Sequence, residues 1–203
     1  MKKILSGCLA ILLSVWILMP ASAAVSGSVY TVVKGDSLWK IAVRHEIGVS
    51  EIIAANPQIK NPDLIYPGDR VTIPEQDAGV LAYEEEVIRL VNEIREKNGL
   101  KPLTKNWELC RVARYKSQDM VENRYFSHTS PTYGSPFQMM KAFGLRYRTA
   151  GENIAFGQRT PQEVMNAWMN SSGHRANILN PSFTQIGVGY VANGRYWTQM
   201  FIG

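Results

Sequence analysis

Apolar and polar residues alternate over residues 29–33, where β-branched side chains are frequent, and this pattern predicts a short strand. Polar turn residues follow, and apolar residues then recur at helical spacing over residues 38–42. A second short helix is expected to end at the Asn-Pro pair 56–57, before a second strand at residues 70–73. The order predicts a small βααβ module over residues 29–74, near the lower size limit for a domain without disulfides.

A short polar linker, residues 75–80, separates this module from a larger domain over residues 81–203. The larger region has apolar residues at helical spacing with charged residues between them, which predicts amphipathic helices. These helices fall near residues 87–98, 107–123 and 161–169. Two apolar segments joined by an Asn-Gly turn, 188–191 and 196–201, predict a late hairpin. Helices that precede strands favour a three-layer α/β/α sandwich, so the whole chain is predicted to be α+β.

The first residues have the pattern of an export signal. Lys2 and Lys3 precede an apolar run that continues to Met19, and the small residues 21–23 form a cleavage site. We expect the signal, residues 1–24, to be removed, which predicts a secreted, extracellular protein with no stable membrane span. The alternative is a retained membrane anchor, but the apolar run is short and ends at a proline.

Charge and cysteine content narrow the classes of partner. The chain has 22 Lys and Arg and 17 Asp and Glu, a net charge of +5. Loss of Lys2 and Lys3 leaves 20 basic residues and a net charge of +3, a mild basicity that suits an anionic wall. No run combines basic and aromatic residues, so a nucleic-acid partner is not expected. Only Cys110 remains after cleavage, which excludes a disulfide within the mature chain, and its helical context predicts a buried apolar role.

The small module carries several short motifs in a fixed order. They are Tyr-Thr-Val at 30–32, Lys-Gly-Asp-Ser-Leu-Trp at 34–39, Ile-Ala at 41–42, Asn-Pro at 56–57 and Ile-Tyr-Pro-Gly at 65–68. Together they resemble a LysM repeat over the whole module. The resemblance implies binding of glycans that contain N-acetylglucosamine (GlcNAc), usually peptidoglycan, in a shallow groove between two loops. It implies a groove lined by Gly35, Asp36, Ser37 and Leu38 on one side and by Asn56, Ile65, Tyr66, Pro67 and Gly68 on the other.

These residue types suit a sugar. Glycine lets backbone donors and acceptors approach the acetamido group, and apolar side chains contact the sugar face. Asp36 and Ser37 could equally cap the helix that follows them, and both roles stay open. A single shallow repeat is expected to bind weakly unless a second contact adds avidity.

The larger domain carries three segments with candidate chemistry. They are Phe-Ser-His-Thr at 126–129, Gly-Glu-Asn-Ile-Ala at 151–155 and Ser-Gly-His-Arg-Ala-Asn-Ile-Leu at 172–179. With Ala-Trp at 167–168 and Ile-Gly-Val-Gly-Tyr at 186–190, they resemble the CAP (SCP-like) superfamily. The resemblance implies a cleft lined by two histidines and two glutamates, of which His128, Glu152 and His174 match three. The second glutamate usually follows the tryptophan, but Met169 and Asn170 follow Trp168 here.

Two histidines and a carboxylate are ligands that a divalent metal such as zinc accepts. His128, Glu152 and His174 are therefore candidate metal ligands as well as cleft residues whose catalytic role is open. In the alternative, Glu152 only accepts a hydrogen bond from an imidazole, and the histidines form a polar floor. We expect Asn153, Arg175 and Asn177 to brace the cleft walls.

Two functions follow from these motifs. In the first, a LysM module anchors the chain to peptidoglycan in a cell wall or spore envelope, and the CAP domain binds an unknown ligand. In the second, the protein is a metal-dependent hydrolase that acts on wall peptides or glycans. The first is favoured, because the CAP superfamily is better characterised for binding ligands, lipids and partners than for any general reaction.

Overall fold

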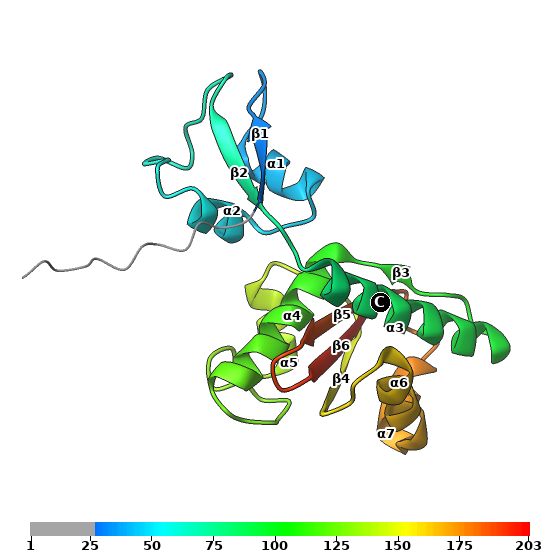
Figure 1. The fold of residues 1–203 in the computed structure, drawn as a ribbon. Helices are drawn as coiled ribbons and strands as arrows, with labels where there is room; N and C mark the ends of the chain where they lie inside the picture. Colours follow the sequence, from blue (N-terminus) through cyan, green and yellow to red (C-terminus); the bar gives the residue numbers. More distant parts are fainter. Residues whose placement is uncertain (1–26) are drawn as a thin grey trace, which may run out of the picture.

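A computed structural model describes residues 27–203, so the predicted export signal lies outside the described residues. The small module contains β1 (Gly27–Thr31), α1 (Leu38–Arg44), α2 (Val49–Ala55) and β2 (Arg70–Pro74), shown apart from the larger domain in Figure 1. This confirms the predicted βααβ order. β1 and β2 pair antiparallel, and their two-stranded sheet packs against both helices around buried side chains that include Ile41, Ile52 and Val71.

The larger domain alternates helices and strands along the chain. Its elements are α3 (Ala78–Lys97), β3 (Thr104–Lys105), α4 (Trp107–Glu122), α5 (Pro136–Ala142), β4 (Ala150–Phe156), α6 (Pro161–Asn170), α7 (Ser172–Ile178), β5 (Gln185–Val191) and β6 (Tyr196–Ile202). Helix α3 begins inside the predicted linker, because the Asp77 carboxylate accepts a hydrogen bond from the Val80 amide and caps the helix. The sequence patterns did not predict α5, α7 or β4.

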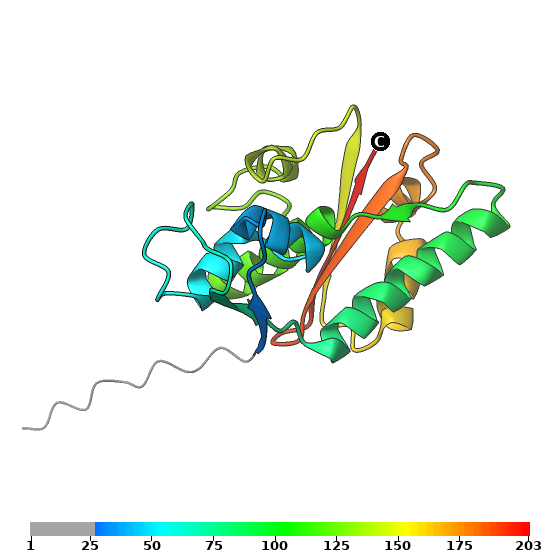
Figure 2. The same cartoon turned by 90° about the horizontal axis from the view of Figure 1, so that it is seen from above.

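The four strands form one sheet in the order β3-β5-β6-β4, with β3 parallel to β5 and the other pairs antiparallel. Helices α4 and α5 lie on one side of the sheet, and α3, α6 and α7 lie on the other (Figure 2). The α/β/α layering predicted from the sequence is therefore present. The two apolar layers between helices and sheet contain the buried Trp168 and Trp197 on the α3 side and Met140 and Met200 on the α4 side.

Two glycines set the close approach of α4 to the sheet. A Cβ added at Gly187 would lie 2.3 Å from the carbonyl carbon of Leu109, and one at Gly189 would lie 2.1 Å from the amide nitrogen of Arg114. Any side chain at either position would push α4 away from β5. The contact fixes the next turns of α4 over β5 and β6, where the Ser117 hydroxyl lies 2.9 Å from Gly189 O and 2.8 Å from Thr198 Oγ1.

The two modules touch through α2 and α4. Arg111 Nε and Nη2 donate to the two carboxylate oxygens of Glu51 at 2.5 and 2.9 Å, and Arg111 Nη2 also donates to Ser50 Oγ at 2.8 Å. The Tyr115 hydroxyl donates to Glu51 Oε1 at 3.1 Å. The pair is half-buried and bidentate, which makes it stronger than an ordinary surface ion pair.

Within residues 27–203, no helix combines the length and apolar character needed to cross a membrane.

Candidate functional site

The centre of the larger domain's candidate cleft is a hydrogen bond between His128 and Glu152. Glu152 projects from β4, and His128 lies in the segment that follows α4, with its Nδ1 2.7 Å from Glu152 Oε1. The Glu152 side chain is only 2% exposed, whereas that of His128 is 52% exposed. The pair therefore joins a buried carboxylate to an imidazole that solvent and ligands can reach.

Burial raises the pKa of Glu152, while the hydrogen bond from His128 and the charge of Lys116 act in the opposite direction. The second carboxylate oxygen, Oε2, is buried and has no hydrogen-bond partner among the described residues. A buried acceptor without a partner is costly when it is charged, which agrees with the raised pKa of the Glu152 carboxyl.

A buried lysine positions the His128 segment. Lys116 is fully covered in α4, and its Nζ donates to Ser127 O at 2.7 Å, to His128 O at 3.0 Å and to the Tyr125 hydroxyl at 3.0 Å. Burial lowers the pKa of Lys116, although the charges of Glu152 and Asp119 oppose that shift. Lys116 thus ties the backbone of the histidine segment to the helix beneath it.

Asp119, one turn further along α4, holds the rest of the same segment. Its carboxylate accepts hydrogen bonds from Ser130 Oγ at 2.7 Å, Thr132 Oγ1 at 2.6 Å and Asn123 Nδ2 at 2.8 Å, and also from the Tyr125 hydroxyl. Burial would raise the pKa of Asp119, but these hydrogen bonds outweigh it and lower the pKa. Lys116 and Asp119 were not predicted from the sequence, although a lysine in the apolar stripe of a helix was the available signal.

His174 lies on α7, beside a network of asparagines. Asn153 Nδ2 donates to His174 O at 3.1 Å and to Gln199 Oε1 at 3.0 Å, and Asn177 Nδ2 donates to Asn153 Oδ1 at 2.8 Å and to Glu152 O at 3.1 Å. Asn153 and Asn177 therefore brace the wall, as expected. Arg175 instead donates to Met169 O, which joins α7 to the end of α6.

Burial lowers the pKa of His174, and the neighbouring charge of His128 lowers it further. The two histidines are thus close enough to interact electrostatically. Among the described residues, however, no three or more His, Cys, Asp or Glu side chains converge as a metal site would require. Glu152 directs one oxygen to Nδ1 of His128. Because the three side chains do not converge, the arrangement does not fit a three-ligand zinc site.

The second candidate site is a hollow on the small module with a volume of about 210 Å³. It is lined by Asp36, Ser37, Leu38, Trp39, Val49, Ile53, Pro62, Asp63 and Ile65. Four of these, Asp36, Ser37, Leu38 and Ile65, were expected in the glycan groove. Trp39 was not, although its position off the buried stripe of α1 leaves the indole 64% exposed. We call this hollow the groove.

The groove residues Asp36 and Ser37 also have structural roles. Ser37 Oγ accepts from the Lys40 amide at 3.2 Å and caps α1. Asp36 Oδ2 accepts from the Val33 amide at 3.0 Å and from the Tyr30 hydroxyl at 2.7 Å, and these bonds lower the pKa of Asp36. Gly35, before them, has φ 91°, a conformation that favours glycine.

Asn56 was expected in the groove, but its side chain is buried and hydrogen-bonded inside the module. Its Nδ2 donates to Ile52 O at 2.8 Å and Thr72 O at 2.7 Å, its Oδ1 accepts from the Thr72 amide at 2.7 Å, and the residue is 1% exposed. An amide so fully engaged joins α2 to β2 and does not reach a ligand. The other expected residues, Gly35, Tyr66, Pro67 and Gly68, do not line the groove either; Tyr66 lies next to groove residue Ile65 and is 58% exposed.

Cys110 is completely buried in α4, and burial raises the pKa of its thiol to about 11. A thiol that stays protonated is a poor nucleophile, in agreement with the predicted apolar role.

Comparison with known proteins assigns both modules. Residues 88–201 match the CAP family, described as the cysteine-rich secretory protein family, and residues 30–74 match the LysM domain. The uncharacterized protein YkwD of Bacillus subtilis is 61% identical over 132 residues, which cover 65% of this chain and 51% of YkwD. The chain thus spans about half the length of that relative.

Two further comparisons cover other shares of the chain. The probable autolysin LDP of Staphylococcus aureus is 40% identical over 52 residues, covering 26% of this chain and 18% of that protein. The crystal structure of an extracellular protein containing an SCP domain, from Bacillus anthracis, superimposes with a TM-score of 0.59 at 33% identity. That superposition covers 67% of this chain and 47% of the other.

Proposed function

Because this chain belongs to the CAP family of cysteine-rich secretory proteins and has a LysM domain before its CAP domain, we propose that it is an extracellular peptidoglycan-binding protein. The LysM groove holds a GlcNAc-containing glycan, and the CAP domain presents its cleft to a second ligand. The wall of a vegetative cell and the envelope of a spore are both glycan layers of this kind.

The observation that carries the glycan proposal is the composition of the groove. Exposed Trp39 and Ile53 provide apolar surface for the faces of sugar rings, while the exposed carboxylate of Asp63 provides hydrogen-bond acceptors for hydroxyl and amide groups. Asp36 is not such an acceptor, because Val33, Tyr30 and Arg44 already bind its two oxygens. The ligand is expected to be neutral or weakly charged where it touches Asp63. A GlcNAc unit, which has hydroxyl groups and an acetamido N–H, meets that requirement.

For the CAP domain we propose binding rather than catalysis. The His128–Glu152 pair offers one exposed imidazole, oriented by a buried carboxylate, that can form a hydrogen bond with a ligand. The second glutamate that the family pattern would supply is absent after Trp168. The alternative, a metal-dependent hydrolase, would need these side chains to converge on one ion, and no three His, Cys, Asp or Glu side chains of residues 27–203 do so.

Retention on insoluble peptidoglycan tests the anchoring proposal. We expect the mature chain to sediment with the polymer and Trp39→Ala to lose about fivefold in affinity, since one aromatic contact contributes roughly 1 kcal/mol. Phe137→Ala is the matched control, because Phe137 is also an exposed aromatic side chain, 47% accessible, but lies on α5. Equal retention of wild type and Trp39→Ala would refute a glycan site at the groove.

Separate measurements test the location and the cleft. N-terminal sequencing of the protein recovered from culture fluid or wall fractions is expected to begin near Ala24. Incubation of the mature protein with peptidoglycan, with and without added zinc, is expected to leave the polymer undigested. Release of soluble fragments that His128→Ala and His174→Ala abolish would establish the hydrolase instead.

A further inference from the structure

A second hollow lies between the two modules, directly beside the groove. It has a volume of about 230 Å³ and is lined by Trp39, Ala42, Val43, Ile47, Gly48, Val49 and Ser50 from the small module and by Trp107, Glu108 and Arg111 from α4. We call it the seam. Trp39 and Val49 line both the groove and the seam, so the two hollows share a wall.

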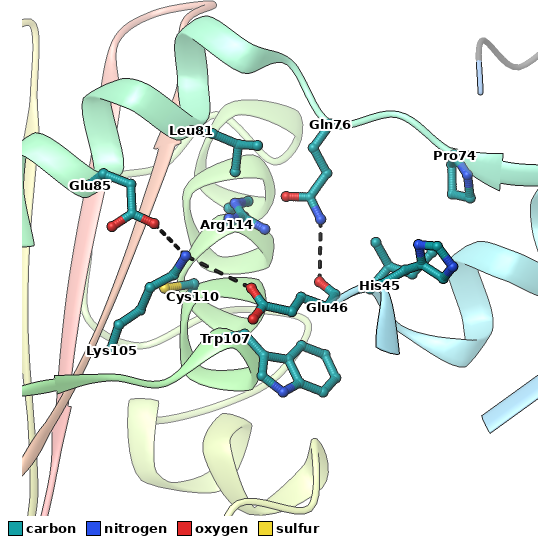
Figure 3. Close-up of a pocket in the computed structure, with 11 residues that line it drawn as sticks. His45, Glu46, Pro74, Gln76, Leu81, Glu85, Lys105, Trp107, Cys110 and Arg114 are labelled. Carbon is teal, nitrogen blue, oxygen red and sulfur yellow. Dashed lines mark hydrogen bonds and ion pairs between the residues drawn. The ribbon is translucent and has the colours of Figure 1, made fainter. Parts of the chain in front are cut away.

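The seam is bordered by contacts between the two modules. Arg111, which lines it, binds Glu51 and Ser50. Beyond it, the hollow of about 260 Å³ drawn in Figure 3 continues between the modules, and Trp107 lines both. In that view the Trp107 indole extends from the start of α4 toward the small module, beside Glu46. The indole is half-buried, so one part packs and the rest is accessible.

From this geometry we propose that the seam is a further sugar subsite: a glycan strand seated in the groove continues past Trp39 and packs a sugar ring against Trp107. This inference rests on the proposed glycan-binding function. Trp39 in the shared wall and Trp107 in the seam present flat apolar surfaces, on which sugar rings can stack. Glu108 and Arg111, next to Trp107 on α4, offer an acceptor and donors for hydroxyl and acetamido groups.

The charges around the seam favour a neutral sugar over a peptide. Arg111 is already paired with Glu51, and Lys105, in the adjoining hollow, is already paired with Glu85 and lies 3.9 Å from Glu46. A charged peptide would have to compete with these ion pairs. A sugar ring needs only the indole face and hydrogen bonds, which leave the pairs intact.

A glycan that spans groove and seam touches both modules at once. The CAP domain therefore contributes directly to the affinity for the glycan strand. Because the two contacts are on one ligand, the second is intramolecular and adds to an intrinsically weak LysM site. Short oligomers fill the groove alone, and longer ones gain the Trp107 contact.

Calorimetric titration of the mature chain with chito-oligosaccharides, from the trimer upward, tests this. We expect wild-type affinity to rise with length and then level off. In Trp107→Ala the affinity for short oligomers is unchanged but the rise with length, about fivefold, is lost. Trp107→Phe, which keeps an aromatic face, is expected to recover part of it. Phe137→Ala is the control for removal of an exposed aromatic on the same domain.

A second readout does not depend on a variant. In the wild-type chain, the indole N–H signal of Trp107 is expected to shift with long oligomers and not with short ones. That measurement decides the matter if Trp107→Ala and Trp107→Phe fail to fold.

The outcomes separate the two proposals. If wild type binds oligomers but Trp107→Ala retains the full rise with length, the seam is not a sugar subsite, while the groove function stands. If wild type binds no oligomer of any length, the groove function itself fails. If the Trp107-dependent gain appears only with peptide-bearing glycan fragments, the seam binds the peptide and this inference is overturned.

Discussion

Lys116 is the residue whose removal most directly tests how the cleft is built. It is fully buried and donates three hydrogen bonds, two of them to the backbone carbonyls of Ser127 and His128. Lys116→Met keeps the length and the apolar stem of the side chain but removes every donor. The variant therefore separates the packing of α4 from the anchoring of the histidine segment.

The expected cost is the balance of two effects. A hydrogen bond from a charged donor contributes about 1.5–3 kcal/mol, and three are lost. Against this, the burial cost of the ammonium disappears, and the carbonyls of Ser127 and His128 belong to exposed residues that regain water when the segment moves. We expect a net loss of about 2–3 kcal/mol in the free energy of unfolding, a fall in melting temperature of roughly 10 °C.

Changes near His128 and Glu152 test the role of Lys116 more directly than the change in the free energy of unfolding. Amides near His128 are expected to exchange hydrogen faster, because the segment loses its attachment to α4. The charge of Lys116 lowers the pKa of Glu152, so its removal raises that pKa further above the usual range. Calorimetric unfolding, hydrogen exchange and carbon NMR titration of Glu152 measure the three effects.

Lys141→Met is the matched control, since Lys141 is an exposed lysine in a helix of the same domain. Its stability is expected to stay within about 0.5 kcal/mol of wild type. This role of Lys116 is refuted if Lys116→Met has the same melting temperature as the control variant and leaves both the exchange rates near His128 and the pKa of Glu152 unchanged.

Three further predictions concern other parts of the chain. Asn56→Ala leaves a backbone amide and two backbone carbonyls without their side-chain partner and should destabilise the small module by about 2–4 kcal/mol, measured by chemical denaturation. Asn61→Ala, at an exposed asparagine, is the control and should not destabilise it. Equal effects of the two variants would contradict a structural role for Asn56. Glu51→Gln removes the carboxylate charge that pairs with Arg111, so small-angle scattering should show a wider spread of module orientations. A scattering profile identical to that of wild type at both low and high salt would argue against the contact between α2 and α4. Burial lowers the pKa of His174 from 6.5, so as pH falls the unfolded chain takes up this proton before the folded chain does. The free energy of unfolding should therefore decrease as pH drops below about 6.5 through the folded pKa. His174→Asn should reduce this pH dependence, and an unchanged pH dependence would show that His174 does not cause it.

Much of the small module was predictable from the sequence because its signals are local. The spacing of Leu38, Ile41 and Ala42 marks the buried face of α1, and Ser37 caps it where the pattern begins. The same spacing left Trp39 outside that face, and the structure exposes it. The role of Asn56 was not predictable, because its partner Thr72 lies on β2, 16 residues away, and the packing of α2 against β2 decides which groups meet.

In the larger domain, the motifs named the candidate cleft residues but not the residues that support them. His128 and Glu152 were named from their segments, and the structure joins them through a 2.7 Å contact. Strand β4 was missed because it lies at the edge of the sheet and carries Glu152 and Asn153, which interrupt its apolar pattern. Whether the two histidines and Glu152 share one centre depends on side-chain directions that no spacing specifies.

The sequence by itself determined the two modules, their order, their families and the residue types of both sites, since periodicity and short motifs are properties of neighbouring residues. Only the tertiary structure decided which side chains form hydrogen bonds within the fold and which remain accessible to a ligand. Asn56 and Lys116 form buried hydrogen bonds, while Trp39 and Trp107 line one hollow between the two modules. The physical reason is that burial and hydrogen bonding depend on segments far apart in the chain, whose approach is fixed by packing.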